Sequence, residues 1–247
     1  MPKFFFTYEQ IKDNEITILG EDVKHIANVL RLKKEDEIQI CNLDTKMNYI
    51  ANINEIDKKY VKCKIKKIEN TDSETQVNIT LYQGLPKADK MEYIIQKNVE
   101  LGVKKIIPVE MERSIVKFDQ KTVEKKIERW QKISEVASKQ SGRDIIPKIE
   151  IPTNIKKICE NINEYDIVLV AYENEEDNTL KTELQKIKRT DNLKIAIIIG
   201  PEGGIDKKEI LQLKEVGAKT ITLGQRILRT ETASIVVISN IIYELEM

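Results

Sequence analysis

Two polar segments near the C-terminus contain the residue types best suited to bind a small ligand. The first, Gly200–Gly204 (GPEGG), follows the apolar run Ile195–Ile199 and precedes a helix expected to start at Asp206. Glycine has no Cβ atom, so the backbone of such a loop can approach a ligand closely, and open parallel sheets bind ligands at the carboxyl ends of their strands. The loop therefore predicts a ligand site, although a tight strand-to-helix turn explains the same residues about as well.

The composition of this loop narrows the choice of ligand. It matches neither the GxGxxG nor the GxxxxGK[ST] pattern, and it carries a carboxylate, Glu202, where a phosphate cradle avoids negative charge. Sites for nicotinamide dinucleotides and nucleoside triphosphates are thus disfavoured. A cationic or zwitterionic ligand is more compatible with the loop.

The second segment, Leu223–Ala233 (LGQRILRTETA), precedes an apolar helix expected over Ser234–Tyr243. It brings two arginines, Arg226 and Arg229, together with a carboxylate, Glu231. Such a density of polar groups at the end of a strand indicates a site. The threonines of this segment could equally cap the following helix, and the sequence gives both interpretations the same weight.

A sheet and its helices are needed to position these segments. From Val77 onward, strand-like and helix-like stretches alternate, which predicts an α/β fold with a parallel sheet covered by helices. Residues 195–199 form a continuous apolar run, which is typical of a central strand buried on both faces. The expected strands are 77–83, 105–109, 167–171, 195–199 and 220–223, with helices starting near residues 89, 121 and 206.

Capping residues define the ends of these helices. Asp89 and Asp206 can each accept a hydrogen bond from a first helical turn, while Glu92 and Glu209, three residues later, can bond back to the cap. Gly102 predicts the end of the helix that starts near Asp89.

The first seventy residues predict a separate, β-rich module. Strands are expected over Ile38–Ile40, Tyr49–Ile53 and Tyr60–Ile68. In the last strand apolar residues alternate with lysines, and we interpret this basic stripe as a solvated face in preference to an RNA contact. The polar stretch 69–76 suits a linker, so we expect domains at residues 1–72 and 73–247.

Composition argues against several classes of protein. Lys and Arg together number 41, as do Asp and Glu, so any RNA surface must come from local clusters of charge. Three scattered cysteines and one histidine argue against a structural metal site. No stretch approaches the roughly 18 apolar residues of a membrane span, and the first residues have too short an apolar run for a secretory signal. We therefore expect a cytoplasmic protein.

Together, GPEGG and LGQRILRTETA resemble the cofactor-binding signature of the RsmE family, bacterial small-subunit ribosomal RNA uridine-N3 methyltransferases of the SPOUT superfamily. The similarity covers nearly the whole chain in the expected order. It includes His25–Arg31, Lys87 with Asp89–Glu92, Gln96–Val103, and Trp130 with Ser141–Arg143.

This resemblance implies an N-terminal PUA-like β-barrel that helps to bind RNA and a C-terminal SPOUT-type domain with a trefoil knot. It also implies S-adenosylmethionine as the cofactor, no metal, a homodimer packed through the knotted domains, and 16S rRNA within the small ribosomal subunit as the substrate. Leu169–Tyr172 is similar in position to a third cofactor loop. Carried over position by position, the cofactor-binding residues would be Gly200, Glu202, Gly203, Leu223, Gly224, Ile227 and Leu228.

The implied reaction is methyl transfer to the ring nitrogen N3 of a uridine. That nitrogen carries a proton near neutral pH, so the enzyme must remove the proton or stabilise the anion. Arg229 is the expected stabiliser of the anion, and Glu231 is the candidate base.

RNA contacts are predicted at His25, Arg31, Arg113, Arg143 and Arg226. A structural role is an alternative for His25 and for Arg226, and Trp130 is expected to be a core or interface anchor. Two other functions stay open: methylation of a different RNA nucleotide, and RNA binding without catalysis by a ribosome-assembly factor. The intact signature segments argue against the second.

Overall fold

The computed structural model describes residues 1–70, 73–116, 120–188, 190 and 192–246, and the chain divides into two compact units. Unit 1 comprises Met1–Glu74 and Ser138–Ile145. Unit 2 comprises Thr75–Ala137 and Ile146–Met247. The chain therefore contributes two segments to unit 1. The second, 138–145, lies outside the expected N-terminal domain, residues 1–72.

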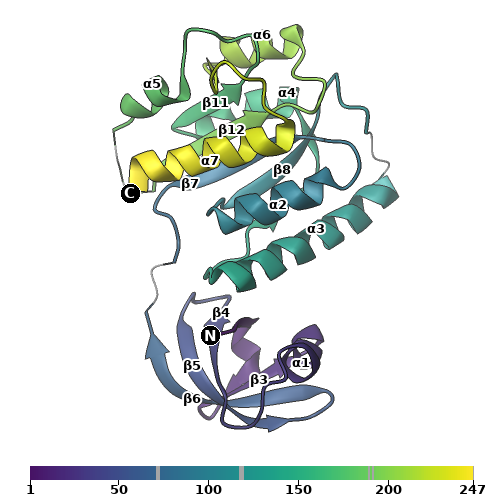
Figure 1. Cartoon of the computed structure of the whole chain (residues 1–247), viewed down its shortest axis with the longest axis vertical. Coiled ribbons are helices and arrows are strands. Elements are labelled where there is room, and N and C mark those ends of the chain that lie inside the picture. The colour runs from purple at the N-terminus through teal and green to yellow at the C-terminus, as the bar shows by residue number, and fades with distance from the viewer. Residues whose placement is uncertain (71–72, 117–119, 189, 191, 247) are drawn as a thin grey trace. The chain divides into compact units, whose positions relative to one another are not determined.

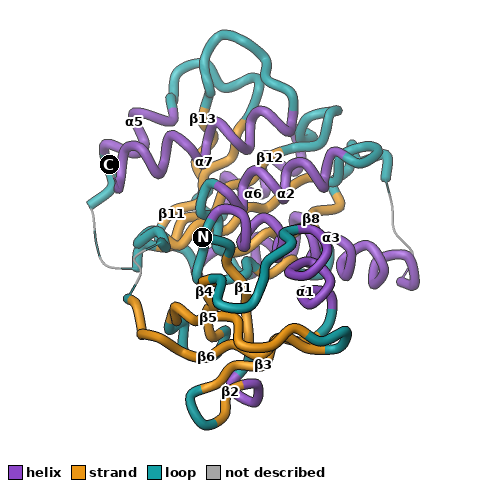
Figure 2. Tube along the Cα trace, turned by 60° about the horizontal axis from the view of Figure 1, so that its bottom comes forward, coloured by secondary structure: helices purple, strands orange, loops and turns teal. Residues whose placement is uncertain are grey.

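Unit 1 is built on a six-stranded sheet that curls into a half-barrel, visible as the curved orange strands β3, β5 and β6 in Figure 2. β1 pairs with β4 in parallel, and the other pairings are antiparallel. Because β1 and β2 lie at opposite ends of the strand order, the predicted β-barrel is an open half-barrel. The strand order is β1 (Lys3–Phe6), β4 (Glu37–Asn42), β5 (Asn48–Ile56), β6 (Tyr60–Glu69), β3 (Glu15–Leu19) and β2 (Ile11–Lys12).

The three strands predicted in this unit are confirmed as β4, β5 and β6, and the alternation in β6 is as expected. Val61 and Cys63 are buried, whereas Lys64 and Lys66 are exposed. β1, β2 and β3 were not predicted; in β1 the three consecutive phenylalanines Phe4–Phe6 have no periodicity to assign. Three helical turns complete the unit: η1 (Tyr8–Gln10), α1 (Glu21–Lys24) and a π-helical turn, η2 (His25–Val29).

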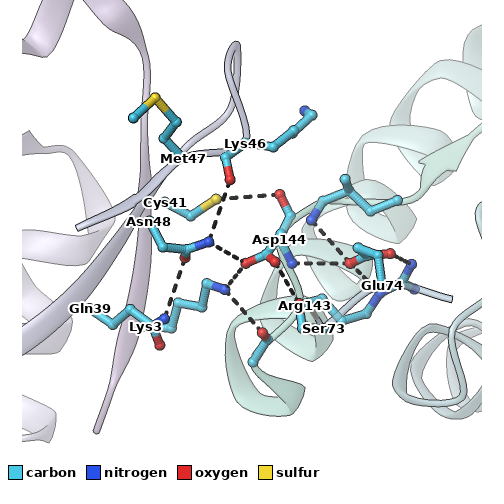
Figure 3. Close-up of polar contacts among 12 residues, drawn as sticks. Lys3, Gln39, Cys41, Lys46, Met47, Asn48, Ser73, Glu74, Arg143 and Asp144 are labelled. Carbon is cyan, nitrogen blue, oxygen red and sulfur yellow. Dashed lines mark hydrogen bonds and ion pairs between the residues drawn. The ribbon is translucent and has the colours of Figure 1, made fainter. Parts of the chain in front are cut away.

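A buried polar cluster joins the two chain segments of unit 1 (Figure 3). The Asp144 carboxylate pairs with the ammonium of Lys3 and accepts hydrogen bonds from Asn48 Nδ2 at 2.7 Å and Ser73 Oγ at 2.8 Å. Beside it, Arg143 Nη2 lies 2.7 Å from a carboxylate oxygen of Glu74. Lys3, Asp144 and Arg143 are at most 5% exposed. Since buried charges are tolerated only when paired, this cluster anchors 138–145 to the half-barrel.

Unit 2 contains a parallel sheet, as predicted. β12, the run of isoleucines, pairs with β7 on one side and with β11 on the other, so it is central. All described pairings of this sheet are parallel. The order is β10 (Thr153–Asn154), β8 (Lys105–Glu110), β7 (Asn78–Gly84), β12 (Lys194–Ile199), β11 (Ile167–Ala171) and β13 (Lys219–Ile221), with β9 (Lys148–Ile149) also pairing with β8.

Helices cover both faces of this sheet. On one face, α7 (Thr230–Glu246) packs beside α2 (Lys90–Glu100) and α5 (Leu180–Gln185), as seen in Figure 1, and α3 (Gln120–Ser141) adds Trp130 to the same core. On the other face lie α4 (Ile155–Glu160), the turn η3 (Ile162–Glu164) and α6 (Lys207–Glu215). Trp130 is 3% exposed, which confirms it as a core anchor.

One of the two predicted capping boxes is confirmed. Asp206 caps α6, and Glu209 bonds back to the Asp206 backbone N–H. The other prediction was wrong: the Asp89 side chain accepts no capping bond, and Glu92 instead forms an ion pair with Arg129 of α3. Gly102 follows the end of α2 with φ +103°, as a helix stop requires. The short helices α4 and α5 were not predicted.

Candidate active site

A cavity of about 500 Å³ lies at the carboxyl ends of β11, β12 and β13. Its walls are three loops, 171–173, 199–204 and 221–230, with Lys90 and Ala233 from α2 and α7. This is the edge of a parallel sheet where ligand sites form. All seven residues predicted to bind the cofactor line this cavity.

The GPEGG loop depends on a close approach between β7 and the end of β12. A Cβ atom on Gly84 would lie 2.6 Å from both the ring Cδ and the backbone nitrogen of Pro201. A Cβ atom on Gly200 would lie 2.8 Å from Ile205 Cγ1. Glycine is therefore required sterically at these positions, and Gly84 supports the loop from outside the signature motif.

Thr230, the first residue of α7, ties the two signature segments together. Its hydroxyl donates to the carbonyl of Gly200 at 2.7 Å and accepts a hydrogen bond from Gln83 Nε2 at 2.8 Å. Thr230 and Gln83 are buried, Gln83 completely, and Gly200 is partly buried. The end of β7, the end of β12 and the start of α7 are thus fixed to one another by one hydroxyl group.

Arg113 supports the same loop from the other side. Its guanidinium donates to the Gly203 carbonyl at 3.1 Å and lies 3.3 Å from a carboxylate oxygen of Asp206. The pKa of Asp206 is lowered, first by the hydrogen bond from the Lys208 backbone N–H and further by Arg113. Arg113 therefore stabilises the turn into α6, while its side chain stays 41% exposed.

Glu202 is held by two residues near the start of α2. Its carboxylate accepts hydrogen bonds from the Lys87 backbone N–H at 3.1 Å and from Lys90 Nζ at 2.7 Å. Burial alone would raise the pKa of Glu202, but these hydrogen bonds outweigh burial and lower it. Glu202 is therefore an ionised carboxylate on the cavity wall.

The second signature segment combines a turn that needs glycine with an exposed apolar side chain. Gly224 has φ +109°, a conformation that L-residues rarely adopt, and its N–H donates to Thr222 Oγ1 at 3.2 Å. Ile227 is 87% exposed although it lines the cavity. An apolar side chain in this position indicates a surface that is covered when a ligand or a macromolecule binds.

The third loop is fastened to β13 by backbone and side-chain bonds. Asn178 Nδ2 donates to the Thr220 carbonyl at 2.8 Å, and the Thr222 N–H donates to the Asn178 carbonyl at 2.8 Å. From this loop Ala171, Tyr172 and Glu173 line the cavity. The predicted third cofactor loop thus reaches the cavity through its last residues.

The two candidate catalytic residues lie in different positions. Arg229 lines the cavity and is exposed, and its carbonyl accepts the first helical bond of α7, from Ala233 N–H at 2.8 Å. Glu231 is not part of the lining. Its atom Oε2 is buried, accepts no hydrogen bond from the described part of the chain, and lies 3.9 Å from Lys90 Nζ.

The residues predicted to contact RNA are dispersed. His25 and Arg31 belong to unit 1 and are exposed; Arg31 lies after the helical turn η2, with φ +54°. In unit 2, Arg226 lines the cavity and is exposed. Arg143 is 3% exposed and paired with Glu74, so its position does not support the predicted RNA contact.

The cavity fits a ligand that joins an apolar portion to a cationic centre. Leu223, Ile227 and Leu228 supply apolar surface, and Glu173 and Glu202 supply carboxylates on the same wall. S-adenosylmethionine, with an adenine ring and a sulfonium, has this character. Among the described residues, no group of three or more His, Cys, Asp or Glu side chains could hold a metal ion, and no helix there is long and apolar enough to cross a membrane.

Comparison with known proteins assigns the two units. Residues 73–242 match the RNA methyltransferase domain family, and residues 18–66 match the RNA methyltransferase PUA domain. Ribosomal RNA small subunit methyltransferase E of Bacillus subtilis is 35% identical over 100% of this chain and 98% of its own length. The chain belongs to this family. The resemblance read from the two signature segments is thereby confirmed.

Solved structures of similar proteins agree with this assignment. Ribosomal RNA small subunit methyltransferase E from Neisseria gonorrhoeae, bound to S-adenosylmethionine, superposes with a TM-score of 0.84 at 31% identity, covering 98% of this chain and 97% of that one. A methyltransferase of Legionella pneumophila in complex with the same cofactor gives 0.86 at 29% identity, covering 98% and 96%.

Several functional positions were missed by sequence reasoning. Lys90, Glu173 and Thr222 line the cavity, and Gln83 supports it through its hydrogen bond to Thr230. Lys90 entered the sequence analysis only as a member of the segment Asp89–Glu92. Its position at the first turn of a helix, where a cation is unfavourable, was a signal that could have marked it.

Proposed function

We propose that this protein transfers a methyl group from S-adenosylmethionine to N3 of a uridine in 16S rRNA. The observation that carries the proposal is the cavity itself, which both signature segments line and which Thr230 holds together. Two proteins that match nearly the whole chain are ribosomal RNA small subunit methyltransferases E. When bound, the cofactor supplies an electrophilic methyl group on a sulfonium.

Gly200, Gly203 and Gly224 offer backbone groups to the cofactor at close range, while Leu223, Ile227 and Leu228 contact its apolar portion. The Glu202 carboxylate, kept ionised by Lys90, favours the positive charge of the sulfonium and amino groups. These residues bind and orient the methyl donor. None of them needs to change its protonation state.

Arg229 stabilises the uridine anion in this proposal. It occupies the N-cap position of α7, where the helix dipole makes a cation unfavourable, and no ion pair of its guanidinium is found among the described residues. A cation at this position can stabilise the negative charge that develops on the uridine ring during the reaction. Glu231, two residues later, accepts the N3 proton.

The RNA substrate is proposed to be held within the small ribosomal subunit, with His25, Arg31 and the exposed Arg113 and Arg226 near phosphates. We further propose that unit 2 contains a trefoil knot and that two copies of the chain form a homodimer packed through unit 2. Two half-exposed or exposed aromatic side chains, Tyr93 on α2 and Tyr243 on α7, are consistent with such an interface.

The test is methyl transfer from labelled S-adenosylmethionine to small subunits that lack the modification, with the nucleoside identified by mass spectrometry. N3-methyluridine is expected, and a different methylated nucleoside would contradict the proposed substrate. Arg229→Ala and Glu231→Gln should each lower kcat by about 10²-fold or more, with cofactor still bound. Near-normal turnover of both variants would refute their assigned roles.

A further inference from the structure

Lys90 stands between two carboxylates that come from separate parts of unit 2. Its Nζ atom lies 2.7 Å from Glu202 Oε1, in the loop after β12, and 3.9 Å from Glu231 Oε2, in the first turn of α7. Lys90 lines the cavity, whereas Glu231 does not. The predicted base therefore lies beside a lysine of the cavity wall and is not itself part of that wall.

The buried carboxylate oxygen of Glu231 is a second, independent observation. Among the residues that the structure describes, none donates a hydrogen bond to Glu231 Oε2, and this atom has less than 1 Å² of accessible surface. An unpartnered buried carboxylate oxygen is costly unless a proton or a donor can reach it. The cation beside it is the Lys90 ammonium, at 3.9 Å, a distance that a small side-chain movement would reduce to a hydrogen bond.

The bonding capacity of Lys90 matches this arrangement. An ammonium group has three N–H donors, and among the described residues Nζ uses one of them, on Glu202. One N–H can then face Glu231 and another the cavity. Lys90 is also the first residue of α2, where the helix dipole disfavours a cation, so its placement is not explained by helix stability.

We propose that Lys90 is a catalytic residue that passes the uridine N3 proton to Glu231. This rests on the proposed function. As Lys90 donates one proton to Glu231 Oε2, its nitrogen takes the N3 proton, so the ammonium ends as it began and Glu231 becomes neutral. The electron pair of the N3–H bond stays on the ring nitrogen, which becomes the nucleophile. Glu231 later releases its proton to solvent, and Glu202 keeps Lys90 in place throughout.

Substitutions of Lys90 distinguish a relay from a fixed charge. Lys90→Arg keeps the positive charge and can keep the ion pair with Glu202, but a guanidinium does not release its proton in a protein. Lys90→Ala removes both functions. The relay predicts that each variant loses about 10²-fold or more in kcat at saturating cofactor and RNA, the range of general acid–base catalysis. Lys97→Ala is the matched control, since this lysine of α2 pairs with its helical neighbour Glu100 and does not line the cavity.

Chemical rescue gives a readout that a structural role would not produce. Small primary amines added to Lys90→Ala should restore turnover, and the effect should increase with the basicity of the amine, whereas guanidinium should not rescue. Titration calorimetry with S-adenosylhomocysteine should show that both variants still bind the cofactor product. If Lys90→Arg had near-normal kcat, or if Lys90→Ala bound S-adenosylhomocysteine but no amine restored it, the relay would be wrong.

Two further outcomes separate the possible failures. If Lys90→Ala weakened S-adenosylhomocysteine binding and kept normal kcat at saturating cofactor, Lys90 would serve the cofactor, and the relay would be overturned. If the unaltered protein forms N3-methyluridine, the proposed function stands in each of these cases. A different product from the unaltered protein would instead remove the proposed function and the relay together.

Discussion

Replacing Thr230 with valine tests how the two signature segments are held together. Valine has nearly the same shape, so the change removes the hydroxyl without opening a cavity. The Gly200 carbonyl would lose its 2.7 Å donor, and Gln83 Nε2 would lose its 2.8 Å acceptor while keeping the Gly84 carbonyl at 3.0 Å. A net hydrogen bond contributes about 1 kcal/mol and an unpaired buried group costs about 1–3 kcal/mol, which gives about 2–4 kcal/mol of lost stability.

Urea unfolding followed by tryptophan fluorescence measures this loss in unit 2. The chain has one tryptophan, Trp130, and it is buried in the core of that unit. Calorimetry should also show weaker binding of S-adenosylhomocysteine to Thr230→Val. The Kd should rise by about tenfold for each 1.4 kcal/mol of binding free energy that is lost when the loop shifts. Thr230→Ser, which keeps the hydroxyl, is the control. Unchanged stability and affinity in the valine variant would refute the reasoning.

Three further predictions test other parts of the account. Gly84→Ala should force Pro201 away and weaken S-adenosylhomocysteine binding by about tenfold or more, as measured by calorimetry, although Gly84 does not line the cavity. Because hydrogen bonds lower the pKa of Glu202 below its ordinary 4.5, its contribution to stability is present above pH 4.5 and is lost as the pH falls through the lowered value. Glu202→Gln should therefore flatten the acid limb of the unfolding free energy measured against pH. Lys3→Met should leave the buried Asp144 carboxylate without its cation and destabilise unit 1 by about 3–5 kcal/mol, measured by urea unfolding with circular dichroism.

The strands of unit 2 could be predicted closely because they are long and apolar. The run 195–199 differs by one residue from β12, and 167–171 coincides with β11. The strand order could not be predicted, because inserting β12 between β7 and β11 depends on contacts between residues far apart in the sequence. The same limit explains why the segment 138–145 was assigned to the C-terminal domain: its partners, Lys3 and Asn48, lie about a hundred residues away or more.

The site could be predicted as far as its motifs extend. Gly200 and Leu223 were identified because glycine-rich and polar segments at strand ends are visible in the sequence. Gln83 and Lys90 were not, because each acts through a partner more than a hundred positions away, Thr230 or Glu202. The expected cap at Asp89 failed for a related reason: Glu92 is drawn to Arg129 of another helix, and a tertiary ion pair replaces the local bond.

The central claim is that the cavity between the two signature segments is the site of methyl transfer. Unit 2 has a second and larger hollow, about 740 Å³, between α2 and α3, lined by Tyr93, Gln96 and Val136 among others. A crystal structure with S-adenosylhomocysteine bound distinguishes them directly. We predict the ligand against Gly200–Gly204 and Leu223–Leu228, within reach of Arg229. Ligand bound in the hollow between α2 and α3, with the cavity at the signature segments empty, would contradict this prediction.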